Sequence, residues 1–507
     1  MSQPAAPPWT RGEAAVWLAV AFAALAARLA WIGHAPFLLD EAETCLNGLR
    51  ISAGNDFPLR GLRTSFGFHN PPTTFYLAAV PTLLGLGPQG MSAMLALAGV
   101  GGAVLAGLAA RAVQGRAAGV AALALVAFSG AALEHSRRIW GHDLVVPGSA
   151  LFLWLLTKSS TGRLCAAGAV VAVLQTMHLS AATLWLPFAL VVSRAEARPA
   201  VRAAAAAFGA LAALYAPWLA ANARDGWSDL HLLAGVVRGA GSLAAPHPVS
   251  PAAAWVFLFG DGLTDDLLRF ARPWSLGPAA MAGSLVANAL SVVIVGAACA
   301  AAVRAERGTS PRLWALAAGA PLLAFAVLFR ASVPAYLLPA LVPLALLAST
   351  ALGRVPSKAL AAGFAVFALA GTTAQLEVRR SAVAEPHAAA PTLAGIRESL
   401  RAGRALAADP GAAFRQDARA RSAAADLSLV YLHHLDTGEP RLPLERKPGA
   451  PLVVLVDPGS LLPTAAAVLL RSGEAANIGS FRVVVLRDPA VVDAYLAVCE
   501  LPKDAPR

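Results

Sequence analysis

Two adjacent carboxylates, Asp40 and Glu41, stand shortly after the first long apolar segment of the chain. A carboxylate in this place can accept a proton from a hydroxyl group and so act as a general base. On composition alone, a solvated pair of charges in a loop explains the two residues equally well. The neighbouring residues favour a catalytic role for the pair, because His69 and Asn70 lie in the same polar loop, directly before two prolines that restrict the backbone.

A third polar cluster, residues 134–147 (EHSRRIWGHDLVVP), lies between later apolar segments. It contains Arg137 and Arg138, whose guanidinium groups suit a phosphate, and Asp143, a further carboxylate. Ionisable groups close to a membrane are costly and tend to mark substrate or ion paths. We therefore predict that the three polar clusters form one active site.

The composition is that of a membrane protein. Of 507 residues, 57% are hydrophobic and only 14% are charged, and the mean hydropathy is +0.62. Such a chain is too apolar for an ordinary soluble protein. The net charge of +11 comes from short Lys and Arg clusters between apolar runs, not from a basic face, so we predict no nucleic-acid partner.

Apolar runs of membrane-spanning length recur along the chain, since a helix needs about 20 apolar residues to cross a bilayer. They lie at 14–33, 91–110, 117–133, 143–157, 203–222, 278–303, 313–329, 332–352 and 359–376. The run 164–193 is too long for one span and has arginines at both ends, which predicts a hairpin turning near His178. The prediction is an all-α polytopic domain, residues 1–376, with about eleven transmembrane helices.

The orientation of the chain in the membrane depends on segment 71–87, which is apolar but short and interrupted by Pro81. If this segment is an interfacial helix and not a span, every basic cluster falls on the cytoplasmic side. That consistency predicts an inside N-terminus and an outside C-terminus. The loops 34–90, 134–142 and 223–277, the His178 turn and the turn before Tyr336 then face the extracytoplasmic side. All three polar clusters meet there.

The character of the chain changes beyond residue 376. Two β-branched runs, at 450–458 and 481–489, flank a helical pattern at 461–472. This pattern predicts a small extracytoplasmic α/β domain at 377–507. It lacks a Gly-rich phosphate loop, so we assign it no catalysis, and both structural capping and a docking role remain open.

The order of these features resembles the GT-C glycosyltransferases. A first span, an outer loop with Asp-Glu, a His-x-Pro-Pro-like segment before an interfacial helix, and an Arg-rich turn with Asp follow one another as in that superfamily. The likeness is closest to the dolichyl-phosphate-mannose protein mannosyltransferases (glycosyltransferase family 39) and the lipid A aminoarabinose transferases. The sequences PWL at Pro217 and AYLLPALVPLALL at 335–347 also resemble segments of this superfamily.

The resemblance implies a transferase that moves a sugar from a polyprenyl-phosphate-linked donor to a glycan, lipid or protein acceptor. It would act on the extracytoplasmic face of the inner (plasma) membrane, among membrane lipids. Asp40 would be the base that activates the acceptor hydroxyl, Glu41 would orient the loop or the acceptor, and Asp143 would be the second acidic residue. Arg137 or Arg138 would hold the lipid phosphate, to which His69 could also donate.

Two departures from the family pattern concern the donor site. This chain reads His-Asn-Pro-Pro where relatives often read His-Pro-Pro, and Ala-Tyr at Tyr336 where they often carry Arg-Tyr, which leaves Arg330 to supply that contact. His178 is either a turn residue or a member of the site. The predicted substrate-binding residues are His69, Asn70, Arg137, Arg138, His178, Tyr336 and Arg330.

No cofactor is predicted, and a divalent metal is left open. The four cysteines show neither CxxC spacing nor a histidine at ligand spacing, so no metal ligand is assigned. Arg28, near the end of the first span, is expected to snorkel to the interface. The alternative function is a lipid or lipid-linked-sugar flippase, but transporters place polar residues at the membrane midplane, whereas here they collect at one face.

Overall fold

The computed structural model describes residues 8–37, 39–64, 67–158, 160–237, 258–260, 278–306, 310–328, 334–384, 393–407, 413–417, 451–456, 475–478, 481–488 and 491. The chain divides into two compact units. The first comprises Met1–Ile32 and Asn47–Val378, and the second Gly33–Leu46 and Arg379–Arg507. The division at 378/379 lies near the predicted boundary at 376/377, but the segment Gly33–Leu46, which the prediction gave to the first domain, belongs to the second unit.

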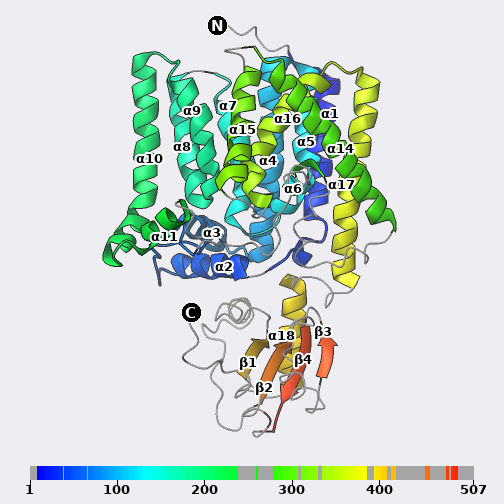
Figure 1. The fold of residues 1–507 in the computed structure, drawn as a ribbon. Helices are drawn as coiled ribbons and strands as arrows, with labels where there is room; N and C mark the ends of the chain where they lie inside the picture. Colours follow the sequence, from blue (N-terminus) through cyan, green and yellow to red (C-terminus); the bar gives the residue numbers. More distant parts are fainter. Residues whose placement is uncertain are drawn as a thin grey trace. The chain divides into compact units, whose positions relative to one another are not determined.

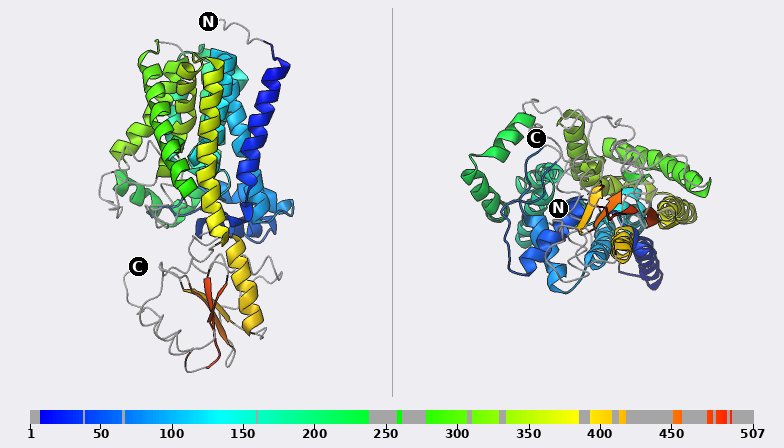
Figure 2. Two further views of the ribbon diagram at one scale, coloured as in Figure 1. Left: turned by 90° about the vertical axis from the view of Figure 1, so that its right-hand side faces the viewer. Right: turned by 90° about the horizontal axis from the view of Figure 1, so that it is seen from below.

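Helices occupy every apolar segment that the sequence predicts to span the membrane, and they run side by side in the first unit (Figures 1 and 2). They are α1 (Arg11–Leu29), α4 (Pro88–Gln114), α5 (Arg116–Phe128), α7 (Val145–Leu155), α8 (Thr161–Met177), α9 (Trp185–Val192), α10 (Ala197–Arg224), α14 (Pro278–Val303), α15 (Ser310–Leu328), α16 (Leu338–Leu352) and α17 (Ser357–Ala384). Within the described residues, five of them, in α1, α4, α10, α14 and α17, are long and apolar enough to cross a membrane. The chain is an all-α membrane protein in this part.

Shorter elements carry the polar segments. They are α2 (Leu39–Ser52), α3 (Thr73–Leu83), α6 (Gly130–His135), α11 (Ser228–Val237) and the 3-10 turns η1 (Ile32–His34), η2 (Gly141–Leu144), η3 (Leu179–Leu184) and η5 (Pro334–Leu337). The predicted interfacial segment 71–87 contains α3, which has 11 residues. At about 1.5 Å per residue such a helix is about half as long as the hydrocarbon core is thick. The helix α7 also has 11 residues, so length alone does not separate the two, and the interfacial place of α3 stays a prediction.

Close packing around α4 depends on glycine. A Cβ atom on Gly102 would lie 2.6 Å from Cα of Pro147 in α7, and one on Gly107 would lie 2.6 Å from the Trp17 ring of α1. Within lipid, helices associate through such small residues because the bilayer supplies no hydrophobic force between them. The glycines of α4 therefore set the distances to α1 and α7.

Arg28 is fully buried, with 0% of its surface exposed. Its Nη1 donates to the carbonyl oxygens of Ala24 at 3.1 Å and Ala127 at 2.8 Å. Ala127 lies in the last turn of α5, where carbonyls lack helical partners. The expectation that Arg28 snorkels to the interface is therefore wrong, because the side chain is buried and its Nη1 finds acceptors inside the bundle.

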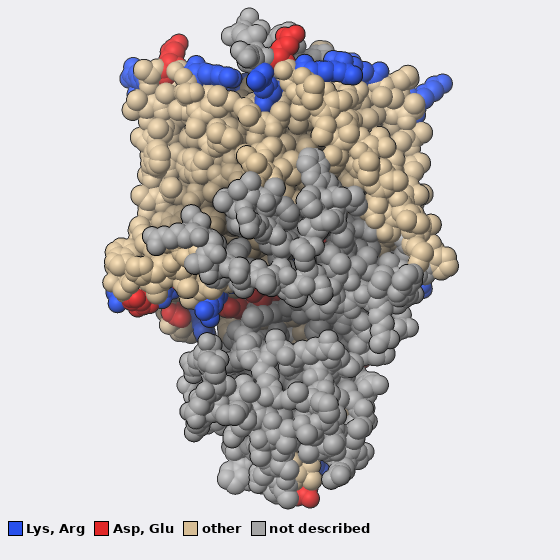
Figure 3. All heavy atoms as spheres, viewed as in Figure 1, with Lys and Arg blue, Asp and Glu red and all other residues tan. Residues whose placement is uncertain are grey.

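The end of the bundle at which α1 begins is basic. Arg111 Nε lies 2.5 Å from Glu13 Oε1, which joins the end of α4 to the start of α1. Ser349 of α16 donates to Gln114 of α4 at 3.2 Å, so a third helix terminus meets there. Figure 3 shows Lys and Arg gathered along this end, above an apolar belt. This is the arrangement from which the sequence predicts the cytoplasmic side.

The second unit contains α18 (Leu393–Ala407) and a four-stranded sheet in the order β1-β2-β4-β3. The strands β2 (Leu452–Val456) and β4 (Phe481–Leu486) are the two β-branched runs, and they pair antiparallel at the centre. The strand β1 (Ala413–Asp417) pairs parallel to β2, and β3 (Ala475–Ile478) antiparallel to β4. The helix predicted at 461–472 lies outside the described residues.

The packing of α4 can be tested with two neighbouring glycines. Gly102→Ala should destabilise the protein by about 1 to 3 kcal/mol, because its methyl group overlaps Pro147. Gly101→Ala is the matched control, since a Cβ there meets nothing within 4 Å. Thermal unfolding of both purified variants in detergent measures the effect, and equal midpoints for the two would contradict the proposed close contact of α4 with α7.

Candidate active site

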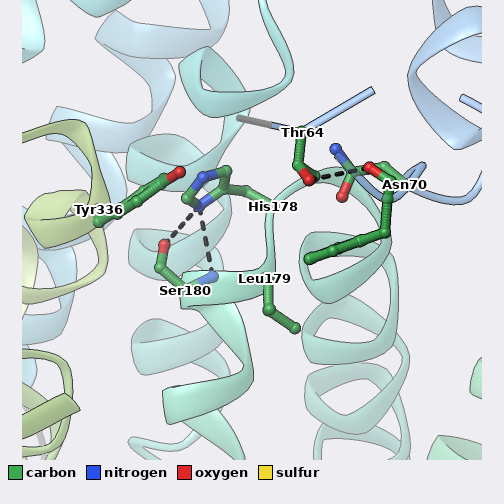
Figure 4. Close-up of a pocket in the computed structure, with 7 residues that line it drawn as sticks. Thr64, Asn70, His178, Leu179, Ser180 and Tyr336 are labelled. Atoms are coloured by element: carbon green, nitrogen blue, oxygen red, sulfur yellow. Dashed lines mark hydrogen bonds between the residues drawn. The ribbon is translucent and has the colours of Figure 1, made fainter. Parts of the chain in front are cut away.

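Three of the predicted substrate-binding residues, Asn70, His178 and Tyr336, line one pocket of the first unit (Figure 4). They come from the loop before α3, from the turn between α8 and η3, and from η5. The pocket is small and partly open, and the unfilled space in it and at its mouth, open solvent included, is about 280 Å³. Its lining residues are Thr64, Phe68, Asn70, His178, Leu179, Ser180 and Tyr336.

A tight backbone hairpin holds Asn70 in this pocket. Gly61 N donates to Asn70 O at 2.7 Å, Asn70 N donates to Leu62 O at 2.9 Å, and Thr64 N donates to Phe68 O at 2.8 Å. A Cβ atom on Gly61 would lie only 2.3 Å from Pro71 O, so the approach of the two strands requires glycine there. The residue inserted between histidine and the two prolines thus places an amide, not an imidazole, in the pocket.

His178 caps the turn that follows α8, with its ring in the pocket. Ser180 N donates to His178 Nδ1 at 3.3 Å, and Ser180 Oγ lies 2.5 Å from the same nitrogen. Because Nδ1 accepts from a backbone N–H, the ring proton is on Nε2. Burial, together with the charge of His135, lowers the pKa of His178 to about 3. The imidazole is therefore a neutral donor at physiological pH, and His178 is both a turn residue and a pocket residue.

A column of rings leads from the pocket to Arg138. The His178 ring lies 4.8 Å from Tyr336 and 3.6 Å from His142, measured between centroids. His142 in turn lies 3.8 Å from Trp140, and the Arg138 guanidinium lies 5.0 Å from the centre of that indole. The column thus has a cation at one end and an uncharged pocket at the other.

Asp143 is buried behind this column, with 2% of its surface exposed. Its Oδ2 accepts a hydrogen bond from Trp140 N at 3.0 Å, and its Oδ1 lies 3.2 Å from His135 Nδ1. Asp143 therefore fixes the backbone of the turn that carries Trp140. Arg137 is also buried, at 2% exposure. Neither Asp143 nor Arg137 is among the residues that line the pocket.

His69 lies behind Asn70 and is held by Asp229 of α11. Its backbone N and its Nδ1 lie 3.1 and 3.0 Å from Asp229 Oδ1, and Trp218 Nε1 donates to its carbonyl at 2.8 Å. Arg60 Nε lies 3.0 Å from Asp229 Oδ2. Asn222 Nδ2 donates to the same oxygen at 3.2 Å.

The Asp229 carboxylate is thus the centre of a network that joins the 53–72 loop to the end of α10 and the start of α11. Burial acts to raise the pKa of Asp229, but the hydrogen bonds from His69 and the charges of His69 and Arg60 outweigh burial and lower it. An ionised carboxylate only accepts, so His69 Nδ1 carries the proton that it shares with Asp229.

Asp40 and Glu41 lie in the first turn of α2, in the segment Gly33–Leu46 of the second unit. Asp40 is half-buried, and Glu41 is buried with 1% of its surface exposed. The exposed N–H groups of a first helical turn favour a nearby negative charge. Arg330 lies outside the described residues.

Sequence reasoning missed Asp229, Arg60 and Ser180. His69 and Asp229 are 160 residues apart, and no local spacing indicates their contact. Ser180 carried a usable signal, because a serine just after a helix end commonly bonds a polar group two residues away, here His178. In the part of the chain that the structure describes, no three His, Cys, Asp or Glu residues form a group that could hold a metal ion.

Comparison with known proteins gives a likeness of fold. No family model and no curated protein matches the sequence. Among solved structures, ArnT from Cupriavidus metallidurans bound to undecaprenyl phosphate is similar at a TM-score of 0.60 and 15% identity, covering 95% of this chain and 99% of that chain. Its apo state gives a TM-score of 0.60 at 14% identity, with 95% and 98% coverage. The Archaeoglobus fulgidus oligosaccharyltransferase tethered with an acceptor peptide gives a TM-score of 0.43 at 14% identity, with 78% and 57% coverage.

The network around Asp229 can be tested by removing its charge. Asp229→Asn should destabilise the protein by about 1.5 to 3 kcal/mol, because hydrogen bonds to a buried charged group are lost. Asp225→Asn is the control, since Asp225 contacts the same Arg60 but its side chain is 50% exposed. Thermal unfolding compares the two, and an equal effect would show that burial of Asp229 contributes nothing.

The same variant has a defined pH dependence. The pKa of Asp229 is lower in the folded protein than its usual 3.8, so the carboxylate stabilises the fold above about pH 3.8. This contribution is lost as the pH falls through the lower, folded-state pKa. The difference in unfolding midpoint between wild type and Asp229→Asn should therefore be full at pH 7 and shrink below pH 3.8. A difference that grows toward acid pH would contradict this assignment.

Proposed function

We propose that this chain, which has the fold of the GT-C membrane glycosyltransferases, is an enzyme that transfers a sugar from a polyprenyl-phosphate-linked donor. The acceptor is a hydroxyl group of a glycan, lipid or protein on the extracytoplasmic face of the plasma membrane. Support comes from the ArnT structure with undecaprenyl phosphate, whose whole length this chain matches in fold.

The observation that carries this proposal is a largely apolar pocket into which a few polar side chains converge at the end of the bundle. Asn70, His178 and Tyr336 reach it from three separate segments of the chain. Polar side chains in a membrane protein are costly unless they are paired or meet a substrate. Their convergence, with Arg138 at the far end of the ring column, suits a ligand that has a polar head and an anionic link to a lipid.

In this proposal Asp40 is the base. Its carboxylate accepts the proton of the acceptor hydroxyl while the oxygen attacks the anomeric carbon of the donor. The new carbon–oxygen bond forms as the bond to the phosphate oxygen breaks, and the polyprenyl phosphate leaves from the opposite face. Arg138, with Arg137 next to it, offsets the negative charge that the phosphate gains.

The remaining predicted residues act as supports. Glu41 is buried beside Asp40 in the first turn of α2, and we assign it the role of orienting that turn. Asp143 acts through the backbone of Trp140. His69 acts through Asn70, because its own Nδ1 is committed to Asp229. Arg330 keeps its predicted role as a phosphate contact.

The basic end of the bundle supports the proposed side of the membrane on which the reaction takes place. Lys and Arg gather at the end where α1 begins (Figures 1 and 3). If this end is cytoplasmic, as the positive-inside rule requires, the pocket lies at the outer end. The donor would then be a lipid-linked sugar that has already reached the outer leaflet.

The role of Asp40 is tested by Asp40→Asn, which keeps the size of the side chain but removes the charge that accepts a proton. Sugar transfer from undecaprenyl-phosphate sugars should fall by about 100-fold or more, as expected when a general base is lost, while lipid binding persists. The control is Asp56→Asn, since Asp56 is an exposed carboxylate of the same loop and should leave transfer unchanged.

The purified wild type, Asp40→Asn and Asp56→Asn are compared in one transfer assay, with donor binding measured in parallel. Full transfer by Asp40→Asn would remove Asp40 from the base role. If wild type binds the donors but transfers sugar from none, and instead moves them across a vesicle membrane, the protein is a flippase and the proposed chemistry is wrong.

A further inference from the structure

The described residues that line the pocket of Asn70, His178 and Tyr336 carry no charge, although the proposed donor carries a phosphate. Its lining residues, all in the described part of the chain, include no Lys, Arg, Asp or Glu. We propose that this pocket binds the sugar ring of the donor, and specifically a neutral, hydroxyl-bearing sugar, whereas the phosphate lies outside it on the Arg138 side. This inference rests on the proposed function and assigns the parts of its substrate.

The hydrogen-bonding groups of the pocket match hydroxyl groups. His178 presents Nε2–H as a donor, because Nδ1 accepts from Ser180 N. Thr64 Oγ1 donates its own proton to Phe68 O at 2.8 Å, which leaves the oxygen as an acceptor. Asn70 offers both an amide donor and an amide acceptor. A sugar hydroxyl both donates and accepts, so it can use all three.

The apolar walls match the carbon faces of a sugar ring. Phe68 and Leu179 line the pocket together with the aromatic ring of Tyr336 (Figure 4). Sites for small molecules combine such apolar walls with a few placed polar groups that fix orientation. A phosphate has no carbon face, so these walls would contribute nothing to binding it.

The charges around the pocket also favour a sugar ring over a phosphate in it. Moving an anion from water into a site without a cation is strongly unfavourable. Burial keeps His178 neutral, so it does not supply the missing positive charge. Among the described residues, Arg138 supplies a cation near this site, and the rings of Trp140 and His142 separate it from the pocket. The missing carboxylate in the lining also disfavours a sugar that carries an ammonium group.

The experiment measures the affinity of the full-length purified protein for undecaprenyl phosphate and for undecaprenyl phosphate bearing mannose, arabinose or 4-aminoarabinose. Wild type should bind a neutral-sugar donor more tightly than undecaprenyl phosphate alone. Tyr336→Phe keeps the ring and removes only the hydroxyl, and Asn70→Ala removes the amide. Each should weaken binding of the neutral-sugar donor by about 2- to 12-fold for each neutral hydrogen bond lost, with binding of undecaprenyl phosphate unchanged.

Two further variants complete the comparison. Arg138→Gln should weaken the binding of undecaprenyl phosphate and of its sugar conjugates by the same factor, because all of them carry the phosphate. His231→Gln, at an exposed histidine of α11, should change neither affinity.

The inference is overturned if Tyr336→Phe and Asn70→Ala weaken the binding of undecaprenyl phosphate as much as that of the sugar donors. That result would place the phosphate in the pocket. Preference for the aminoarabinose lipid, or no gain from any sugar, would also overturn it. Sugar transfer by wild type separates these outcomes from failure of the proposed function. If transfer occurs, only the assignment of the pocket is wrong, and if wild type neither binds nor transfers any of these lipids, both proposals are wrong.

Discussion

Polar side chains inside an apolar bundle must find partners in the protein, and this constraint shapes the first unit. Arg28 donates to helix-end carbonyls, Glu13 pairs with Arg111, and Asp229 gathers four donor groups from three other residues. Because lipid offers no hydrogen bonds, each pair fixes the relative position of two segments. The pairs near the pocket therefore also determine its shape.

The loop that carries Asn70 illustrates this dependence. Asp229 holds His69 through both its backbone and its ring, and the Gly61 hairpin holds the next residue from the other side. Asn70 thereby comes to line the same pocket as His178 and Tyr336. A substitution at Asp229 would reach the pocket through two residues, so its effects on stability and on binding should be coupled.

The arrangement of charge separates tasks within the proposed site. Arg138 provides a cation at one end of the column of rings, whereas the described residues that line the pocket at the other end offer neutral donors and acceptors. A lipid-linked sugar has the same polarity along its length, with an anionic link and a neutral ring. In the proposed function, the site would distinguish the two parts of such a donor by charge.

The sequence by itself determined the helical class, the position of each apolar helix, the hairpin turn at His178 and the strands β2 and β4. These features follow from composition and local periodicity, which do not depend on distant contacts. It also indicated Asn70, His178 and Tyr336, which meet in one pocket. Only the tertiary structure decided that Asn70 and not His69 lines the pocket, that Asp143 and Arg137 are buried outside its lining, that Arg28 is buried, and that Gly33–Leu46 belongs to the second unit. The physical reason is that these outcomes depend on pairings such as His69 with Asp229, 160 residues apart, which leave no periodic or local pattern in the chain.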